Sequence, residues 1–207
     1  MAKYLRMIIV LSLITLVSGF ALGALNEMTA EVAANNILRF KKIPAVTTIY
    51  KAVEEGSLTM ERRRELEAEL LAEKQLIDIG ENQSVLAFVI KKNGEPYAVA
   101  LEKFGQGYGG DLGVMTGFEL ETGRLVGIGI TTMAETPGVG TRVTEPAFTE
   151  KFQNMPRDVV LKVKKDGGDI DAIAGATISS RAVAFAVREA RQFYDKHQEK
   201  IRKAISP

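Results

Sequence analysis

The chain has 207 residues, with 27 basic and 26 acidic side chains and a formal net charge of +1. This length suits one anchored domain better than two full domains. A near-neutral chain without a basic stripe gives no sign of a nucleic-acid partner. The absence of cysteine excludes disulfides and cysteine-ligated iron–sulfur clusters, and the single histidine, His197, is too few for a histidine-rich metal site. Any redox cofactor would therefore be organic, and we predict no metal site.

The first predicted element is an apolar helix. Met7 to Asn26 is a run of 20 residues without a charge, which as a helix spans roughly 30 Å, the thickness of a bilayer's hydrocarbon core. The alternative is a cleaved signal peptide, because Ala21-Leu22-Gly23 is an acceptable cleavage site. The apolar region of a signal peptide runs to only about 7–15 residues. We therefore predict a transmembrane anchor over residues 1–27.

Charges on the two sides of this helix indicate its orientation. Lys3 and Arg6 precede it, and Glu27 and Glu31 follow it. Because cytoplasmic flanks are rich in basic residues, this bias favours a cytoplasmic N-terminus and an extracytoplasmic soluble domain, although residues 39–42 bring three basic side chains near the other end. We predict a single-pass protein of the inner (cytoplasmic) membrane.

Small and weakly polar residues recur on one side of the apolar helix. Ser12, Thr15, Gly19 and Gly23 fall within an arc of roughly 80°, and the two glycines form a G-x-x-x-G step. Such a stripe lets another membrane helix approach closely. The alternative is chance, since glycine is common in membrane helices.

A helical connector is predicted over residues 28–80, packing on the soluble domain of residues 81–207. Helical character continues from Glu27 to Arg39 and is broken before Pro44, because proline disfavours helix at the preceding residue. Thr59 to Gln75 reads as a second, highly charged helix made of strong helix formers. Its charges indicate a solvated face.

Two strand pairs are predicted next. Hairpin signals at residues 92–95 and 121–124 separate apolar runs over residues 85–90, 97–104, 114–120 and 125–132. In the last run Gly127 and Gly129 alternate with apolar residues and leave one face bare. That pattern is typical of a close approach by another backbone or a flat ligand.

The C-terminal part is predicted to alternate between helix and strand. We expect a short helix over residues 144–154 capped by Thr144, a strand over 159–163 and a final helix over about 178–201. Ala182, Phe185 and Ala190 are spaced to bury one side of that last helix. Strands grouped between helices predict an α+β fold with a mainly antiparallel sheet and flanking helices.

The stretch with most chemical content is Asp171-Ala172-Ile173-Ala174-Gly175-Ala176-Thr177-Ile178-Ser179-Ser180-Arg181. It places Thr177 at the start of the last helix, where backbone N–H groups without intrahelical partners favour a phosphate. Taken by itself, Thr177 is better explained as an N-cap, a role that threonine often fills.

This stretch resembles the flavinylation motif D-x-x-[S/T]-G-A-T of the FMN-binding domain family. Asp171, Gly175, Ala176 and Thr177 match the motif, whereas Ala174 stands where Ser or Thr is usual. In that family a flavin transferase, using FAD and magnesium, joins FMN to the threonine through a phosphoester. The departure at Ala174 removes an accessory hydroxyl and not the attachment atom.

Two further segments resemble the family. They are the glycine-rich Gly107-Tyr108-Gly109-Gly110 and the loop Glu135-Thr136-Pro137-Gly138-Val139-Gly140. The resemblance covers roughly residues 84 to 195. It is greatest to the G subunit of Rnf-type ion-translocating ferredoxin:NAD oxidoreductases, and it extends to the C subunit of sodium-pumping NADH:quinone oxidoreductases.

The resemblance implies a role for each matching residue. Thr177 would bear the covalent FMN, and Asp171 together with the Gly-Ala-Thr step would be recognised by the transferase. The phosphate would be surrounded by Gly175, Ala176, Ser179 and Ser180, and the isoalloxazine by Glu135, Thr136, Gly138 and Tyr108. From the residues alone, residues 135–140 are a turn shaped by Pro137 and Gly138, and Tyr108 is equally a packing anchor.

The implied function is that of an electron-transfer subunit, not an enzyme in its own right. The glycine run of residues 105–113 lacks the strand–G-x-G-x-x-G–helix context of a dinucleotide site, so electrons would pass between integral-membrane and iron–sulfur partner subunits. The alternatives are the equivalent quinone-reductase subunit, a non-redox membrane module that kept the fold, and a stand-alone extracytoplasmic reductase.

Overall fold

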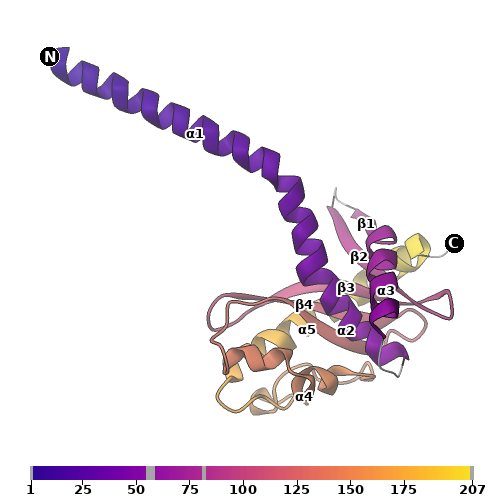
Figure 1. Cartoon of the computed structure of the whole chain (residues 1–207). Coiled ribbons are helices and arrows are strands. Elements are labelled where there is room, and N and C mark those ends of the chain that lie inside the picture. The colour runs from indigo at the N-terminus through magenta and orange to yellow at the C-terminus, as the bar shows by residue number, and fades with distance from the viewer. Residues whose placement is uncertain (1, 55–58, 81–82, 206–207) are drawn as a thin grey trace. The chain divides into compact units, whose positions relative to one another are not determined.

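The computed structural model describes residues 2–54, 59–80 and 83–205. The chain separates into two compact units, Met1–Leu38 and Arg39–Pro207. Figure 1 shows the elements of each unit along the chain. This division falls within the predicted connector, and the three predicted domain boundaries stay a prediction.

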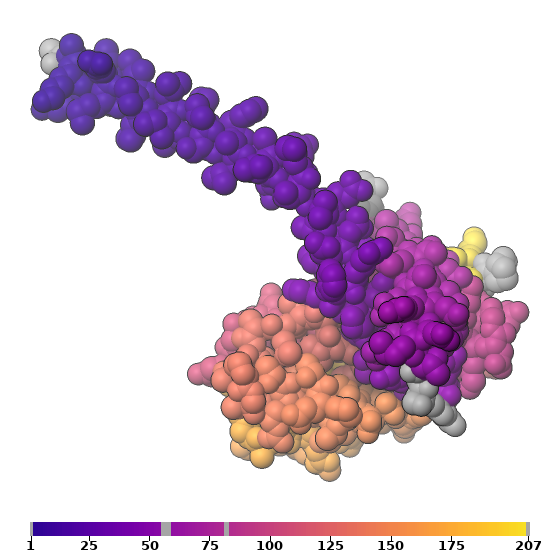
Figure 2. All heavy atoms as spheres, viewed as in Figure 1, coloured from indigo at the N-terminus to yellow at the C-terminus, as the bar shows by residue number. Residues whose placement is uncertain are grey.

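The first unit is the helix α1 (Ala2–Ile37), none of whose residues is buried. Figure 2 shows exposed side chains along the visible side of this helix. Among the described residues, one helix is long and apolar enough to cross a membrane, and it begins with α1. The Thr15 hydroxyl donates to the carbonyl oxygens of Leu11 and Ser12, at 3.1 and 3.0 Å, which satisfies this polar group inside its own helix. The predicted apolar helix is confirmed.

The second unit is built on a five-stranded antiparallel sheet whose strands pair in chain order. The strands are β1 (Gln75–Gly80), β2 (Gln83–Lys92), β3 (Glu95–Gln106), β4 (Asp111–Glu119) and β5 (Leu125–Thr132). At the β2–β3 turn Asn93 and Gly94 have φ values of 55° and 84°, as a tight type I′ hairpin requires. The predicted hairpins are confirmed, whereas β1 lies where the sequence predicted connector.

Helices cover both faces of this sheet. On one face α5 (Thr177–Ile205) crosses β3 and β4, and Phe118 stacks on Tyr194 with ring centroids 4.8 Å apart. The other face is covered by α2 (Ile43–Glu54), which packs on β5 and β4. Because successive strand residues point to opposite faces, Phe118 faces α5 while Gly117 faces α2. The predicted α+β fold is confirmed.

The bare glycine face of β5 is covered by a backbone. A Cβ added to Gly129 would lie 2.2 Å from the carbonyl oxygen of Ala45 in α2. In β4, a Cβ on Gly117 would lie 2.6 Å from a methyl carbon of Ile49. The sequence pattern predicted either a close backbone or a flat ligand against this face, and the structure has the backbone of α2 there. This face of β5 is therefore not open to a flavin.

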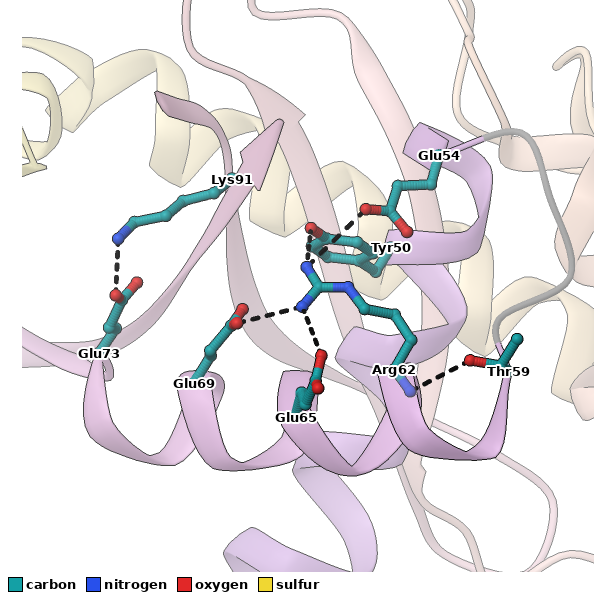
Figure 3. Close-up of polar contacts among 8 residues, drawn as sticks. All are labelled: Tyr50, Glu54, Thr59, Arg62, Glu65, Glu69, Glu73 and Lys91. Atoms are coloured by element: carbon teal, nitrogen blue, oxygen red, sulfur yellow. Dashed lines mark hydrogen bonds and ion pairs between the residues drawn. The ribbon is translucent and has the colours of Figure 1, made fainter. Parts of the chain in front are cut away.

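The charged helix α3 (Met60–Ala72) begins at its N-cap Thr59 and is tied to α2 by Arg62 (Figure 3). Arg62 donates to Glu69 at 3.1 Å and to the Tyr50 hydroxyl of α2 at 3.4 Å. The hydrogen bond that Arg62 donates to Glu69 raises the pKa of Arg62 above its ordinary value. Figure 3 also shows Lys91 of β2 bound to Glu73, so the helix is joined to the sheet by charge as well as by packing.

Three predictions for the C-terminal part are wrong. Residues 159–163 form no strand, because the backbone N–H of Val160 is bound by the Asp169 carboxylate at 2.7 Å and not by a neighbouring strand. The predicted helix over 144–154 is split into three short helices of residues 140–144, 146–149 and 150–152, since Pro146 begins a new turn with Glu145 at its N-cap. Phe185 of α5 is 44% exposed and does not join the core.

Candidate functional site

A cavity of about 330 Å³ lies at one edge of the sheet. The loop of residues 107–110 leaves the end of β3, and residues 133–139 follow the end of β5 at that same edge. The first residues of α5 close the cavity. Its walls are formed by Tyr108, Glu135, Thr136, Val139, Gly140, Gly175, Ala176, Thr177, Ile178 and Ser179.

The start of α5 brings Thr177 into this cavity. Thr177 is the first residue of the helix and is partly buried. The Ser180 N–H donates to the carbonyl oxygen of Ala176 at 3.0 Å. The N–H groups of the helix residues before Ser180 have no acceptor within the helix. Gly175 has φ of +83°, and a Cβ there would meet nothing within 4 Å. An anion can therefore approach this helix end without steric hindrance.

Ser180 serves the loop and not the cavity. Its buried hydroxyl accepts a hydrogen bond from the Ile173 N–H at 3.0 Å and donates to the Ala176 carbonyl at 2.9 Å. It is absent from the cavity wall. The sequence suggested that Ser180 lies beside the phosphate. In the structure its hydroxyl instead accepts one hydrogen bond and donates another within the turn into α5.

Glu135 lies at the centre of the site and is 8% exposed. One of its oxygens accepts the backbone N–H of Tyr108 at 2.8 Å, and the other accepts the Ser179 hydroxyl at 3.0 Å. Glycines make room for this carboxylate, because a Cβ on Gly107 or Gly140 would lie 2.0 or 2.4 Å from its oxygens. The carboxylate thus joins the glycine-rich loop, its own loop and the first turn of α5.

Apolar side chains stand around the cavity. Tyr108, Val139 and Ile178 are 73%, 44% and 46% exposed. Large apolar groups on a surface are informative where they cluster around a hollow with a few polar groups, as at sites for flat organic ligands. Val139, Gly140 and Ile178 were not among the residues predicted from sequence. The packing of Gly140 on the Glu135 carboxylate is a signal that only the fold reveals.

Two predicted site residues shape the loop of residues 135–140. Thr136 lines the cavity, and its carbonyl oxygen accepts the N–H groups of Val139 and Thr141 at 3.2 and 3.3 Å. Gly138, with φ of +73°, donates its N–H to the Thr141 hydroxyl at 2.9 Å and lies outside the cavity wall. The turn expected from the sequence is therefore present, and it also borders the cavity.

Asp171 is exposed on the surface and precedes, in the chain, the cavity residues at the start of α5. Its carboxylate is bound by Lys164 at 2.9 Å, and this hydrogen bond holds the pKa of Asp171 below its usual range. Arg181 turns away to form two hydrogen bonds with Asp166, at 2.6 and 2.7 Å. Its charge is therefore neutralised outside the cavity. The remaining polar groups and the open helix end fit a phosphate-bearing ligand with a flat ring.

The residues that form this cavity lie within a stretch that matches a known domain family. Residues 107–192 match the family described as FMN-binding domain, and this stretch contains all the residues of the cavity wall. The resemblance found in the sequence is thus confirmed.

The chain is similar to the G subunit of the ion-translocating oxidoreductase complex. It is 36% identical over 130 residues to that protein from Vibrio vulnificus (strain YJ016), covering 59% of this chain and 61% of the relative. With the corresponding protein from Pseudomonas aeruginosa (strain UCBPP-PA14) it is 36% identical over 122 residues, 56% of each chain. The matches therefore span about three fifths of the curated relatives.

A solved structure shares the fold. Shewanella oneidensis NqrC matches with a TM-score of 0.50 and 18% identity, over 64% of this chain and 70% of that chain. At this identity the likeness extends to the fold alone.

Proposed function

We propose that this chain is the electron-transfer subunit of a membrane-bound, ion-translocating redox complex of the Rnf type, and that it bears FMN covalently on Thr177. The observation that carries the proposal is the place of Thr177. It is the first residue of α5 and lines a cavity between the two loops that resemble the FMN-binding family. The similarity to the G subunits of such complexes supports the assignment.

The covalent step joins the Thr177 side-chain oxygen to the phosphorus of the FMN half of FAD. The pyrophosphate bond of FAD breaks, AMP leaves, and the hydroxyl proton is released, so that no electrons are exchanged. A separate flavin transferase with magnesium would catalyse this step and would recognise Asp171, Gly175 and Ala176 beside Thr177. The exposure of Asp171 leaves its carboxylate accessible to such an enzyme.

The chain's own residues would hold the attached group in three ways. The first turn of α5 would offer its backbone N–H groups to the phosphate, where the helix dipole favours negative charge. Gly175 leaves the approach open. Tyr108, Val139 and Ile178 offer apolar contact to the ring, which supplies one- or two-electron chemistry when bound. Because the ester is covalent, the flavin would stay with the protein in a compartment where replacement is scarce.

The membrane partners are proposed on the same basis. The anchor α1 would hold the domain beside integral-membrane and iron–sulfur subunits that deliver and remove electrons. Its stripe of small residues, none of them buried, offers one of these subunits a close packing face. The domain would lie outside the cytoplasm, and a single cysteine introduced at the exposed Gln192 should react with a membrane-impermeant thiol reagent in intact cells. Reaction in lysed cells alone would place the domain inside.

The attachment is tested by coexpressing the full chain with a flavin transferase. The wild-type chain should show flavin fluorescence on a denaturing gel, an intact mass raised by FMN less water, and a modified peptide containing Thr177. Thr177→Val should abolish all three, because it removes the atom that bears the ester. Thr144→Val is the matched control, since the Thr144 hydroxyl binds the Thr141 carbonyl outside the cavity wall.

Each contrary result has a definite meaning. A fluorescent Thr177→Val band would show that the attachment site is wrong. An unmodified wild-type chain would favour a non-redox module that kept the fold. Partner genes distinguish the two redox complexes, because an iron–sulfur subunit that interacts with ferredoxin points to the Rnf type and not to the quinone reductase.

A further inference from the structure

Glu135 is a buried carboxylate in the wall of a cavity suited to an anionic cofactor, so its charge would act on the reduction potential of a flavin bound there. We propose that Glu135 is a positioning residue that holds the cavity in shape and that its negative charge lowers the reduction potential of the attached FMN. The second half of the proposal rests on the proposed function, whereas the first half concerns the chain without cofactor.

The positioning role follows from what each oxygen contacts. One oxygen binds the Tyr108 N–H in the loop after β3, and the other binds the Ser179 hydroxyl in the first turn of α5. These groups are 27 and 44 residues away from Glu135 in the chain. A single side chain therefore links two segments that no helix or strand joins. Tyr108 and Ser179 both line the cavity, so the link connects two of its walls.

The surroundings of Glu135 leave the carboxylate little freedom. It is 8% exposed, and a Cβ on Gly107 or Gly140 would overlap its oxygens. Because these two neighbours are glycines without side chains, their backbones lie directly against the carboxylate. A side chain packed in this way stays in one place whether or not the cavity is filled.

The charge of Glu135 has no cationic partner in the described part of the chain. None of the ion pairs formed there includes it, and its two hydrogen-bond donors are a backbone amide and a hydroxyl, both neutral. Arg181, the basic residue nearest in sequence to the helix start, is bound to Asp166. The negative charge of Glu135 is thus not cancelled by a direct ion pair.

A negative charge at this place opposes reduction of the flavin. Reduction adds electrons to the ring, and nearby negative charge raises the energy of the more negative form. The interaction is strengthened by burial, because the surrounding medium is less polar than water. Glu135 should therefore shift the couple towards the oxidised form, and neutralising it should raise the potential.

Glu135→Gln separates the charge from the geometry. The glutamine oxygen can accept the Tyr108 N–H, and its amide can donate to Ser179, because a serine hydroxyl both donates and accepts. The variant therefore keeps the shape and both hydrogen bonds while it loses the charge. Glu145→Gln is the matched control. It removes the same charge from a side chain that is 52% exposed, pairs with Arg142 and lies at the N-cap of the helix 146–149, outside the cavity wall.

The first measurement is spectroelectrochemical titration of the flavinylated full chain. We expect Glu135→Gln to favour reduction at least tenfold, which is a rise of about 59 mV for a one-electron couple or about 29.6 mV for a two-electron couple. Glu145→Gln should shift the equilibrium less than threefold. An unchanged or lowered potential in Glu135→Gln would overturn the charge role, as would equal shifts in the two variants.

The second measurement needs no flavin. In the Thr177→Val background, amide hydrogen exchange at Tyr108 reports whether its N–H is bound. Glu135→Ala should speed that exchange at least tenfold, whereas Glu135→Gln should leave it close to the parent rate. Equal protection in all three chains would refute the positioning role. If the wild-type chain bears no FMN, the proposed function fails, and this measurement still decides the role of Glu135 in shaping the cavity.

Discussion

Replacing Gly129 with alanine should force α2 away from the sheet. The added Cβ would lie 2.2 Å from the Ala45 carbonyl oxygen and 2.6 Å from the Ala45 Cα, well inside the 3.4 Å at which ordinary contact begins. These are backbone atoms of a helix, so relief requires α2 to move as a body. Overpacking of this kind costs about 1–3 kcal/mol, which corresponds to a fall in Tm of about 2–12 °C for a domain of this size.

The same strand supplies the control. A Cβ on Gly127 would meet the Ala52 Cβ at 3.6 Å, an ordinary contact. Because alanine has less conformational freedom in the unfolded chain, Gly127→Ala should be neutral or stabilise by up to about 1 kcal/mol. Thermal and urea unfolding of the two full-length variants in detergent measures the difference.

Two results would refute this reasoning. Equal stability of the two variants would mean that the approach of α2 to Gly129 does not limit the packing. A loss of bound flavin in both variants, with stability unchanged, would mean that a flat ligand covers this face of β5. We expect flavin content to be unaffected by Gly127→Ala, because Gly127 is not part of the cavity wall.

The remaining predictions concern the loop before α5. Ser180→Ala should lower the free energy of unfolding by about 1–3 kcal/mol, because the buried N–H of Ile173 loses its acceptor. The same variant should slow flavinylation, measured by intact mass. An unchanged unfolding midpoint would contradict the stability prediction. The hydrogen bond from Arg181 holds the pKa of Asp166 below its usual value. The Arg181–Asp166 ion pair therefore stabilises the fold above about pH 3.9, the pKa of an aspartate in the unfolded chain. This stabilisation is lost as the pH falls through the lower pKa of Asp166 in the folded chain. The Tm difference between wild type and Asp166→Asn should therefore be larger at neutral pH than in strong acid, and a constant difference would refute the assignment.

The sequence predicts best what depends on local geometry. The β2–β3 hairpin follows from Asn93-Gly94, which readily adopts positive φ. The last helix and the place of Thr177 follow from helix periodicity and from the resemblance around Gly175. These features require few contacts with distant parts of the chain, so neighbouring residues suffice to specify them.

The parts that the sequence did not predict depend on distant partners. The apparent strand at residues 159–163 is reduced to a single bridge between Val163 and Ile170, since the Asp169 carboxylate binds the Val160 N–H. The strand β1 follows a charged helix and buries mainly Ile77, so its alternation is weak. Ser180 looks like a phosphate ligand in the motif, yet the folded loop uses its hydroxyl internally. In each case contacts made only in the folded chain decide the outcome.

The position of α5 in the chain also orders events during synthesis. The strands β1 to β5 pair with their sequence neighbours, so each hairpin can form as soon as its second strand has emerged. The helix α5, which completes the core, follows all five strands in the chain, and it packs on β1, β3 and β4 together. Thr177 meets Tyr108 and Glu135 only once that helix has docked. The complete cavity is therefore absent until α5 has docked, and a protein lacking α5 would expose the surface of β1, β3 and β4 that this helix covers.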